Sequence, residues 1–192
     1  MVYTTGVVST LDVMLAYYAA PTILGVKPAS LFWCTNSDRI NNQIEYFNKS
    51  AEEKGFVIKR IKGRKEHMGL MVFHRTILDR YLKDAKCMAF LKQFGYSRFL
   101  SLEEKLAYLK TRLETYAEFP HEIGIFLGYP IEDVEGFIKN KGQNYLLRGS
   151  WLVYSDAENA DRIFSQHRLC RDMAVNCVIN GISIYELLQM ED

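Results

Sequence analysis

Three side chains capable of acid/base chemistry lie within five residues near the middle of the chain: Glu118, His121 and Glu122, in the pattern E-x-x-H-E. Because histidine titrates near neutral pH, His121 beside Glu122 could transfer protons or orient a ligand. A Glu-x-x-His pair is also half of a di-iron site, but only one copy exists and Pro120 interrupts the helix that such a site needs. A structural role for Glu122 stays open, because an acid in a first helical turn interacts favourably with the helix dipole.

Basic and amide side chains form a second group of candidates. Lys27 precedes Pro28 at the start of an expected strand, where its ammonium could meet an anion or a carbonyl. Lys141 and Asn144 lie in a loop around Gly142, ahead of another expected strand. A basic run beside an expected hairpin could hold phosphate, although lysines on edge strands also prevent aggregation. That run comprises Lys59, Arg60, Lys62, Arg64 and Lys65.

The four cysteines, Cys34, Cys87, Cys170 and Cys177, form no C-x-x-C pair, which favours reduced thiols in the cytoplasm. Cys170 and Cys177 share one face of an expected helix, and His167 could join them. Two thiols alone do not complete a tetrahedral metal site. We therefore predict no metal and no cofactor.

Composition limits the classes of partner. A net charge of +1 supplies no strong field for a polyanion, so nucleic acid is not an expected partner. Residues 124–138 have the skeleton of a helix-turn-helix, but Glu132, Asp133 and Glu135 on the second helix would repel phosphates. The apolar N-terminus contains Asp12 and no Lys or Arg before Lys27, which argues against a signal peptide. No apolar run approaches the roughly 20 residues of a membrane span, so no membrane partner is expected.

Hydrophobic spacing and capping residues predict an α+β fold with a small mixed, largely antiparallel sheet of about four strands covered by helices. The run MGLMVFH should be the central strand, since it is apolar on both faces. With 192 residues, a single domain over 1–192 is expected, with an N-terminal helical extension over 1–19. Strands are predicted at 29–34, 56–61, 68–74 and 145–154. Helices are predicted after a cap at Ser9 or Thr10, at 38–54 and 76–94, at Pro120 and Pro130, and after capping boxes at Ser101 and Ser155.

Five segments resemble the domain-of-unknown-function family 3793, a group of small soluble bacterial proteins. They are KPASLF at 27–32, FPHEIG at 119–124, FLGYP at 126–130, EDVEGFI at 132–138 and KNKGQNYLLRGSWLVYSD at 139–156. The likeness covers about residues 20–190 and implies a shared fold without an assigned reaction. Many relatives have cysteines at the places filled here by Ala19, Tyr145, Leu147 and Ser150. If those cysteines bind iron, haem or zinc, this chain is a degenerate metal or redox module that keeps only Cys170 of the set.

Taken together, the residues predict a cytoplasmic domain that binds a small anionic molecule or a protein partner. The predicted binding residues are Lys27, His121, Glu122, Lys141 and Asn144. The alternative is an enzyme in which His121 and Glu122 transfer protons while Lys27 stabilises a developing negative charge. Both hypotheses require Lys27 and His121 to face one hollow.

Overall fold

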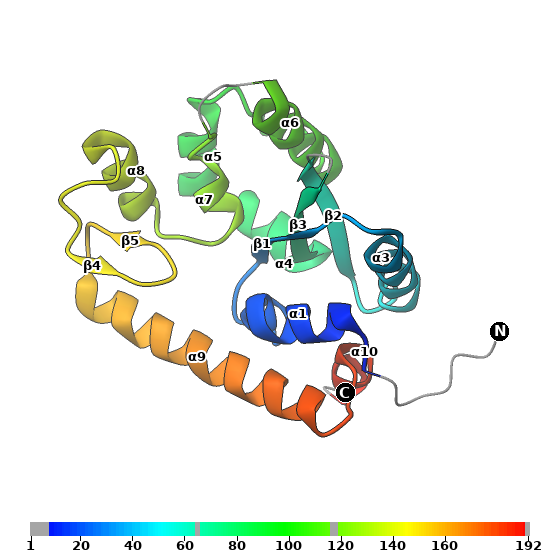
Figure 1. The fold of residues 1–192 in the computed structure, drawn as a ribbon. Coiled ribbons are helices and arrows are strands. Elements are labelled where there is room, and N and C mark those ends of the chain that lie inside the picture. The colour runs from blue at the N-terminus through cyan, green and yellow to red at the C-terminus, as the bar shows by residue number, and fades with distance from the viewer. Residues whose placement is uncertain (1–7, 64–65, 116–118, 191–192) are drawn as a thin grey trace. The chain divides into compact units, whose positions relative to one another are not determined.

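The computed structural model describes residues 8–63, 66–115 and 119–190. The described chain combines helices with antiparallel strands, which confirms the predicted α+β class. It divides into two compact units (Figure 1): residues 1–75 with 167–192 form the first, and residues 76–166 form the second. That the whole chain acts as one domain stays a prediction, and the predicted extension over 1–19 is described only from residue 8 onward.

The first unit contains a three-stranded antiparallel sheet in the order β1-β3-β2. Its strands are β1 (Ala29–Thr35), β2 (Phe56–Gly63) and β3 (His67–His74). The three strands predicted here are confirmed, and the central place of β3 follows from its apolar residues on both faces. Phe32 of β1 lies opposite Leu70 of β3, and both belong to the buried core of this unit.

Helices α1 (Thr10–Tyr18), α2 (Ala20–Ile23), α3 (Asp38–Ser50) and α10 (Ile184–Gln189) complete the first unit together with the end of α9 (Ala157–Ile179). Ser9 caps α1 as predicted. The buried Asp12 carboxylate accepts hydrogen bonds from the backbone N–H of Ser9 (2.7 Å) and of Ile184 (2.8 Å). It therefore joins the N-termini of α1 and α10, two segments that lie far apart in the sequence.

The second unit is mostly helical. Its helices are α4 (Arg75–Leu82), α5 (Ala85–Lys92), α6 (Leu102–Thr115), α7 (Ile123–Phe126), α8 (Ile131–Asn140) and the start of α9, and the first residue of α4, Arg75, still belongs to the first unit. Its two strands are β4 (Leu147–Arg148) and β5 (Leu152–Val153). The prediction of one helix over 76–94 was wrong. Asp84 Oδ1 accepts hydrogen bonds from the backbone N–H of Lys86 (2.9 Å) and Cys87 (3.2 Å), so a new helix starts there.

The segment after α8 also differs from the prediction. The single strand predicted over 145–154 is a hairpin of two short strands, and Gly149 lies in its turn. The capping box predicted at Ser155 is absent, since the Ser155 hydroxyl bonds to Asp133 (2.8 Å). Asp156 instead accepts a hydrogen bond from the Asn159 N–H (3.0 Å) at the start of α9. The box predicted at Ser101 is confirmed.

Candidate functional site

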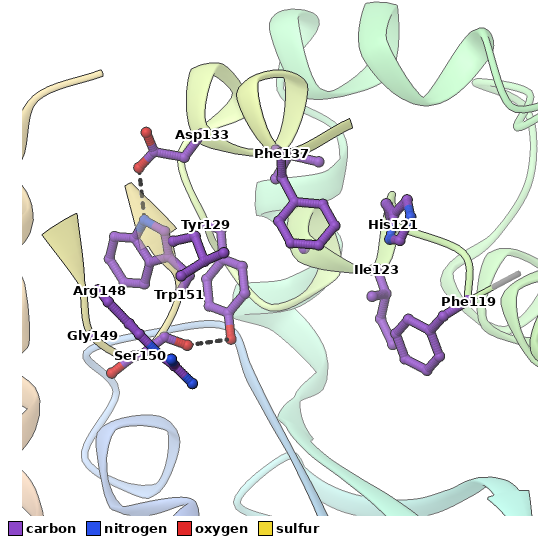
Figure 2. A pocket seen from close by; sticks show the side chains of 13 residues that line it. Phe119, His121, Ile123, Tyr129, Asp133, Phe137, Arg148, Gly149, Ser150 and Trp151 are labelled. Atoms are coloured by element: carbon purple, nitrogen blue, oxygen red, sulfur yellow. Dashed lines mark hydrogen bonds between the residues drawn. The ribbon is translucent and has the colours of Figure 1, made fainter. Parts of the chain in front are cut away.

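A cavity of about 340 Å³ lies within the second unit (Figure 2). Four successive stretches line it: residues between 119 and 124, Tyr129, the part of α8 between 133 and 137, and residues 148–152 of the hairpin. All four stretches fall in segments that resemble the family. The cavity is therefore built by one continuous piece of chain inside a single unit.

Close packing of α7 against α8 forms one wall of the cavity. A Cβ on Gly124 would lie 2.8 Å from Val134 Cγ2, so glycine is needed for this approach. Gly128 has a φ of +76° and reverses the chain between the two helices, at the turn of the helix-turn-helix skeleton. The backbone N–H of Tyr129 then donates to the Gly124 carbonyl (2.9 Å), which fixes the place where Tyr129 enters the cavity wall.

Asp133 organises the opposite wall through its carboxylate, which is 2% exposed. Oδ2 accepts a hydrogen bond from the Trp151 indole N–H (2.7 Å), and Oδ1 accepts from the Tyr154 N–H (2.8 Å). The N–H (2.9 Å) and hydroxyl (2.8 Å) of Ser155 also donate to Oδ1. One acid of α8 therefore holds the hairpin, the indole ring and the entry to α9 in place.

Five of the residues that line the cavity carry aromatic rings. Tyr129 stacks on Trp151 with ring centroids 5.0 Å apart, and Trp151 meets Phe164 edge-on at 4.5 Å. His121 packs edge-on against Phe137 at 4.9 Å. Figure 2 shows the His121 and Phe119 rings on one side of the cavity and Trp151 on the other, with Tyr129 and Phe137 between them. Several π faces and edges thus border one small space.

Gly149 permits the hairpin turn to lie directly on Phe164. A Cβ at this position would lie 2.2 Å from Phe164 Cε2. We expect Gly149→Ala to lower the free energy of unfolding by about 1–3 kcal/mol, the usual effect of overpacking a filled space. Urea unfolding measures it. Gly63→Ala is the control, since its added Cβ would meet nothing closer than 4.0 Å. Equal effects of the two substitutions would show that this contact is unimportant.

Few polar groups of the cavity wall remain available to a ligand. Burial raises the pKa of Tyr129 to about 12, so the phenol stays protonated and donates to the Ser150 carbonyl (3.3 Å). The Asp133 oxygens and the Trp151 N–H bond to each other and to the backbone. Within the described residues, the His121 ring nitrogens and the Arg148 guanidinium have no hydrogen-bond partner or ion pair.

His121 and its sequence neighbour Glu122 have different surroundings. His121 lines the cavity, whereas Glu122 is 1% exposed and does not line it. Glu122 makes no capping hydrogen bond at α7, but its Oε1 accepts a hydrogen bond from Arg112 Nε at 2.5 Å. The Tyr96 hydroxyl lies 3.5 Å from the same oxygen, and burial raises the Tyr96 pKa. Glu118, the first member of the pattern, lies outside the described residues.

The remaining predicted site residues are not among those that line this cavity. Lys27 belongs to the first unit, where desolvation lowers its pKa to about 8. Burial also lowers the pKa of His167 to about 4, with a smaller contribution from the Lys27 charge. Lys141 and Asn144 are exposed loop residues with φ of 51° and 57°, and they shape the connection from α8 to β4. Convergence of Lys27 with His121 stays a prediction.

Sequence reasoning did not single out Tyr129, Phe137, Arg148 or Trp151 as site residues. The three aromatic residues follow the same helix and strand periodicity as core residues, so their spacing gives no sign of a site. A usable signal was present in the segment YLLRGSWLVY, because Arg-Gly-Ser interrupts an otherwise apolar run and fits a turn better than a buried strand. A turn there would have placed Arg148 and Trp151 at a loop, where binding residues concentrate.

No cluster of three or more His, Cys, Asp or Glu side chains suited to a metal ion occurs among the described residues. Within the same part of the chain, no helix has the length and apolar character needed to cross a membrane. A second cavity of about 230 Å³ lies beside Asp133 and Asp156, near the start of α9. Its lining is acidic, which makes it a poor site for the anion that the sequence predicted.

Comparison with known families decides the relationship suggested by the five segments. Residues 15–188 match the family described as "Protein of unknown function (DUF3793)". The chain belongs to the DUF3793 family. The match includes every residue that lines the cavity of this DUF3793 protein. No curated protein and no solved structure matches the sequence.

Proposed function

We propose that this DUF3793 protein binds a small organic molecule in the cavity between α7, α8 and the β4–β5 hairpin. The observation that carries the proposal is a cavity of about 340 Å³ that is lined by aromatic and aliphatic side chains and a few polar groups. Ligand sites in proteins usually combine such an apolar lining with a small number of placed polar groups, at volumes of roughly 300–1,000 Å³. The concave shape favours a small molecule over the protein partner that the sequence left open.

Rigid walls support this proposal. Trp151 is held by its hydrogen bond to Asp133, and Tyr129 is held at both ends by hydrogen bonds to Ser150 and Gly124. Gly124 and Gly149 allow contacts that leave little room for rearrangement. A cavity whose rings are already ordered binds with a smaller loss of conformational entropy than one that must order on binding.

One observation favours acid/base catalysis in the same cavity. His121 lines the cavity, and its ring nitrogens have no hydrogen-bond partner within the described residues, so it could exchange a proton with a bound molecule. Glu122 would not assist it directly, since its carboxylate pairs with Arg112. We therefore propose binding as the primary function and keep His121 as the residue for any acid/base step.

Phe119 offers a clean test of binding, because its ring lines the cavity yet is 40% exposed. We expect Phe119→Ala to weaken binding of one-ring and two-ring aromatic fragments by about three- to tenfold, the range for loss of one aromatic contact. Its melting temperature should stay close to that of the unmodified chain. Ligand-observed NMR on the full chain measures the affinities.

Phe99→Ala is the matched control, since Phe99 belongs to the same unit, is 82% exposed and does not line the cavity. It should leave fragment affinities unchanged. The proposal fails if no fragment binds. It also fails if the Phe99 and Phe119 variants lose affinity equally.

A further inference from the structure

We infer that the ligand of this cavity is a planar aromatic anion of one or two rings, with its ring among Tyr129, Phe137 and Trp151 and its anionic group at Arg148. The inference rests on the proposed function and names the class of molecule that the site selects. It uses a residue, Arg148, that the sequence did not place in any site.

Among the polar side chains of the described cavity lining, few remain free to anchor a ligand. Both Asp133 oxygens accept hydrogen bonds from protein donors, so this acid is not available to a ligand cation. The Trp151 N–H and the Tyr129 hydroxyl also donate within the protein. The Arg148 guanidinium, the His121 ring and the Ser150 hydroxyl remain, and none of them has a hydrogen-bond partner in the described part of the chain.

The charge of the wall therefore favours an anion. Arg148 is the one Lys or Arg among the residues that line the cavity, and no described carboxylate pairs with it. The planar guanidinium presents donors in a fork that matches a carboxylate or a phosphoryl group. Figure 2 shows Arg148 on the hairpin side of the cavity and His121 on the opposite side, with the Tyr129 and Phe137 rings between them.

The shape of the site favours a flat molecule of limited size. The volume of about 340 Å³ is at the small end of ligand sites, which suits one or two rings. Ring faces and edges border the space, and they make favourable contacts with another aromatic ring in stacked or edge-on geometry. Neutral aliphatic molecules would gain the burial but neither the ring contacts nor the charged hydrogen bonds.

The test uses three probes that share one ring and differ in one group: 4-(trifluoromethyl)benzoate, 4-(trifluoromethyl)phenyl phosphate and 4-(trifluoromethyl)benzyl alcohol. Their affinities for the full chain are measured by ¹⁹F NMR titration. We expect at least one anion to bind about tenfold tighter than the alcohol, the ratio expected for a charged hydrogen bond. Added salt should weaken anion binding and leave alcohol binding unchanged. The tighter of the two anions identifies the group that Arg148 prefers.

Two variants assign the effect to Arg148. Arg148→Gln should weaken anion binding by about fivefold, less than for a buried arginine because Arg148 is exposed and its charge is screened. The affinity of this variant for the alcohol should change by less than about twofold, because most surface substitutions have small effects. Lys141→Gln, which removes an exposed charge from the adjoining loop, should change neither.

The possible results separate the inference from the proposed function. Equal affinities for the alcohol and the anions, unaffected by Arg148→Gln, would overturn the anion class and leave a binding cavity. Equal losses of anion affinity in Arg148→Gln and Lys141→Gln would overturn the assignment to Arg148. If none of the three probes binds, the proposed function falls as well.

Discussion

Asp133→Ala should lower the free energy of unfolding by about 3 kcal/mol, because the buried Trp151 N–H would stay desolvated without an acceptor and three part-buried donors would lose theirs. The substitution removes the acceptor of four hydrogen bonds, from Trp151, Tyr154 and two groups of Ser155. Release of the indole ring should also abolish fragment binding. Chemical unfolding followed by tryptophan fluorescence, in a Trp33→Phe background that leaves Trp151 as the one tryptophan, measures the loss.

Glu135→Ala provides the control on the same helix, since Glu135 is exposed. Its effect should stay within about 0.5 kcal/mol, as for most surface substitutions. Asp133→Asn should lower the free energy of unfolding by an intermediate amount. Its amide oxygen can still accept hydrogen bonds, whereas its NH₂ group would face the former donors. A loss in Asp133→Ala no larger than in Glu135→Ala would show that the carboxylate does not hold the hairpin.

Arg112→Met should be the second strongly destabilising change. It leaves the Glu122 carboxylate, 1% exposed, without its cation, and removal of one partner from a buried ion pair costs roughly 3–5 kcal/mol. Glu122 Oε2 already has no hydrogen-bond partner among the described residues, so the protein around it offers little replacement. Urea unfolding of the full chain measures the change.

The double variant Arg112→Met with Glu122→Leu should recover much of this loss, since an apolar pair of similar volume can replace a buried ion pair. Lys110→Met is the control: Lys110 and Glu114 form an exposed pair at 4.0 Å on the same helix, α6. Its effect should stay below about 1 kcal/mol. If the double variant is as unstable as Arg112→Met, the instability comes from lost packing and not from an uncompensated charge.

The parts of the fold that depend on nearby residues were predictable from the sequence. Ser9 and Ser101 cap helices through bonds to residues three positions away, and the apolar run of β3 fixed its central place in the sheet. Two of the predictions that were wrong involve a competing polar partner. Asp84 begins a new helix within an apolar pattern, and Ser155 turns from its own helix to Asp133 across 22 positions.

The candidate site was predictable only in part, for the same physical reason. The segment FPHEIG gave His121, which lines the cavity, but the partner of Glu122 is Arg112, on a helix whose pattern showed only leucine spacing. Aromatic residues of a cavity wall have the same spacing as those of a filled core, so periodicity alone does not distinguish them. Only the coordinates show that Tyr129, Phe137 and Trp151 border an open space.

The most direct test of the binding cavity is a ¹⁵N–¹H shift map of the full chain titrated with 4-(trifluoromethyl)benzoate. Our account predicts that the largest changes occur at the amides of 119–124, 129–137 and 148–152 and at the indole N–H of Trp151. The Trp33→Phe variant assigns that indole signal, since the chain has two tryptophans. Largest changes outside these stretches, or none anywhere, would contradict the account.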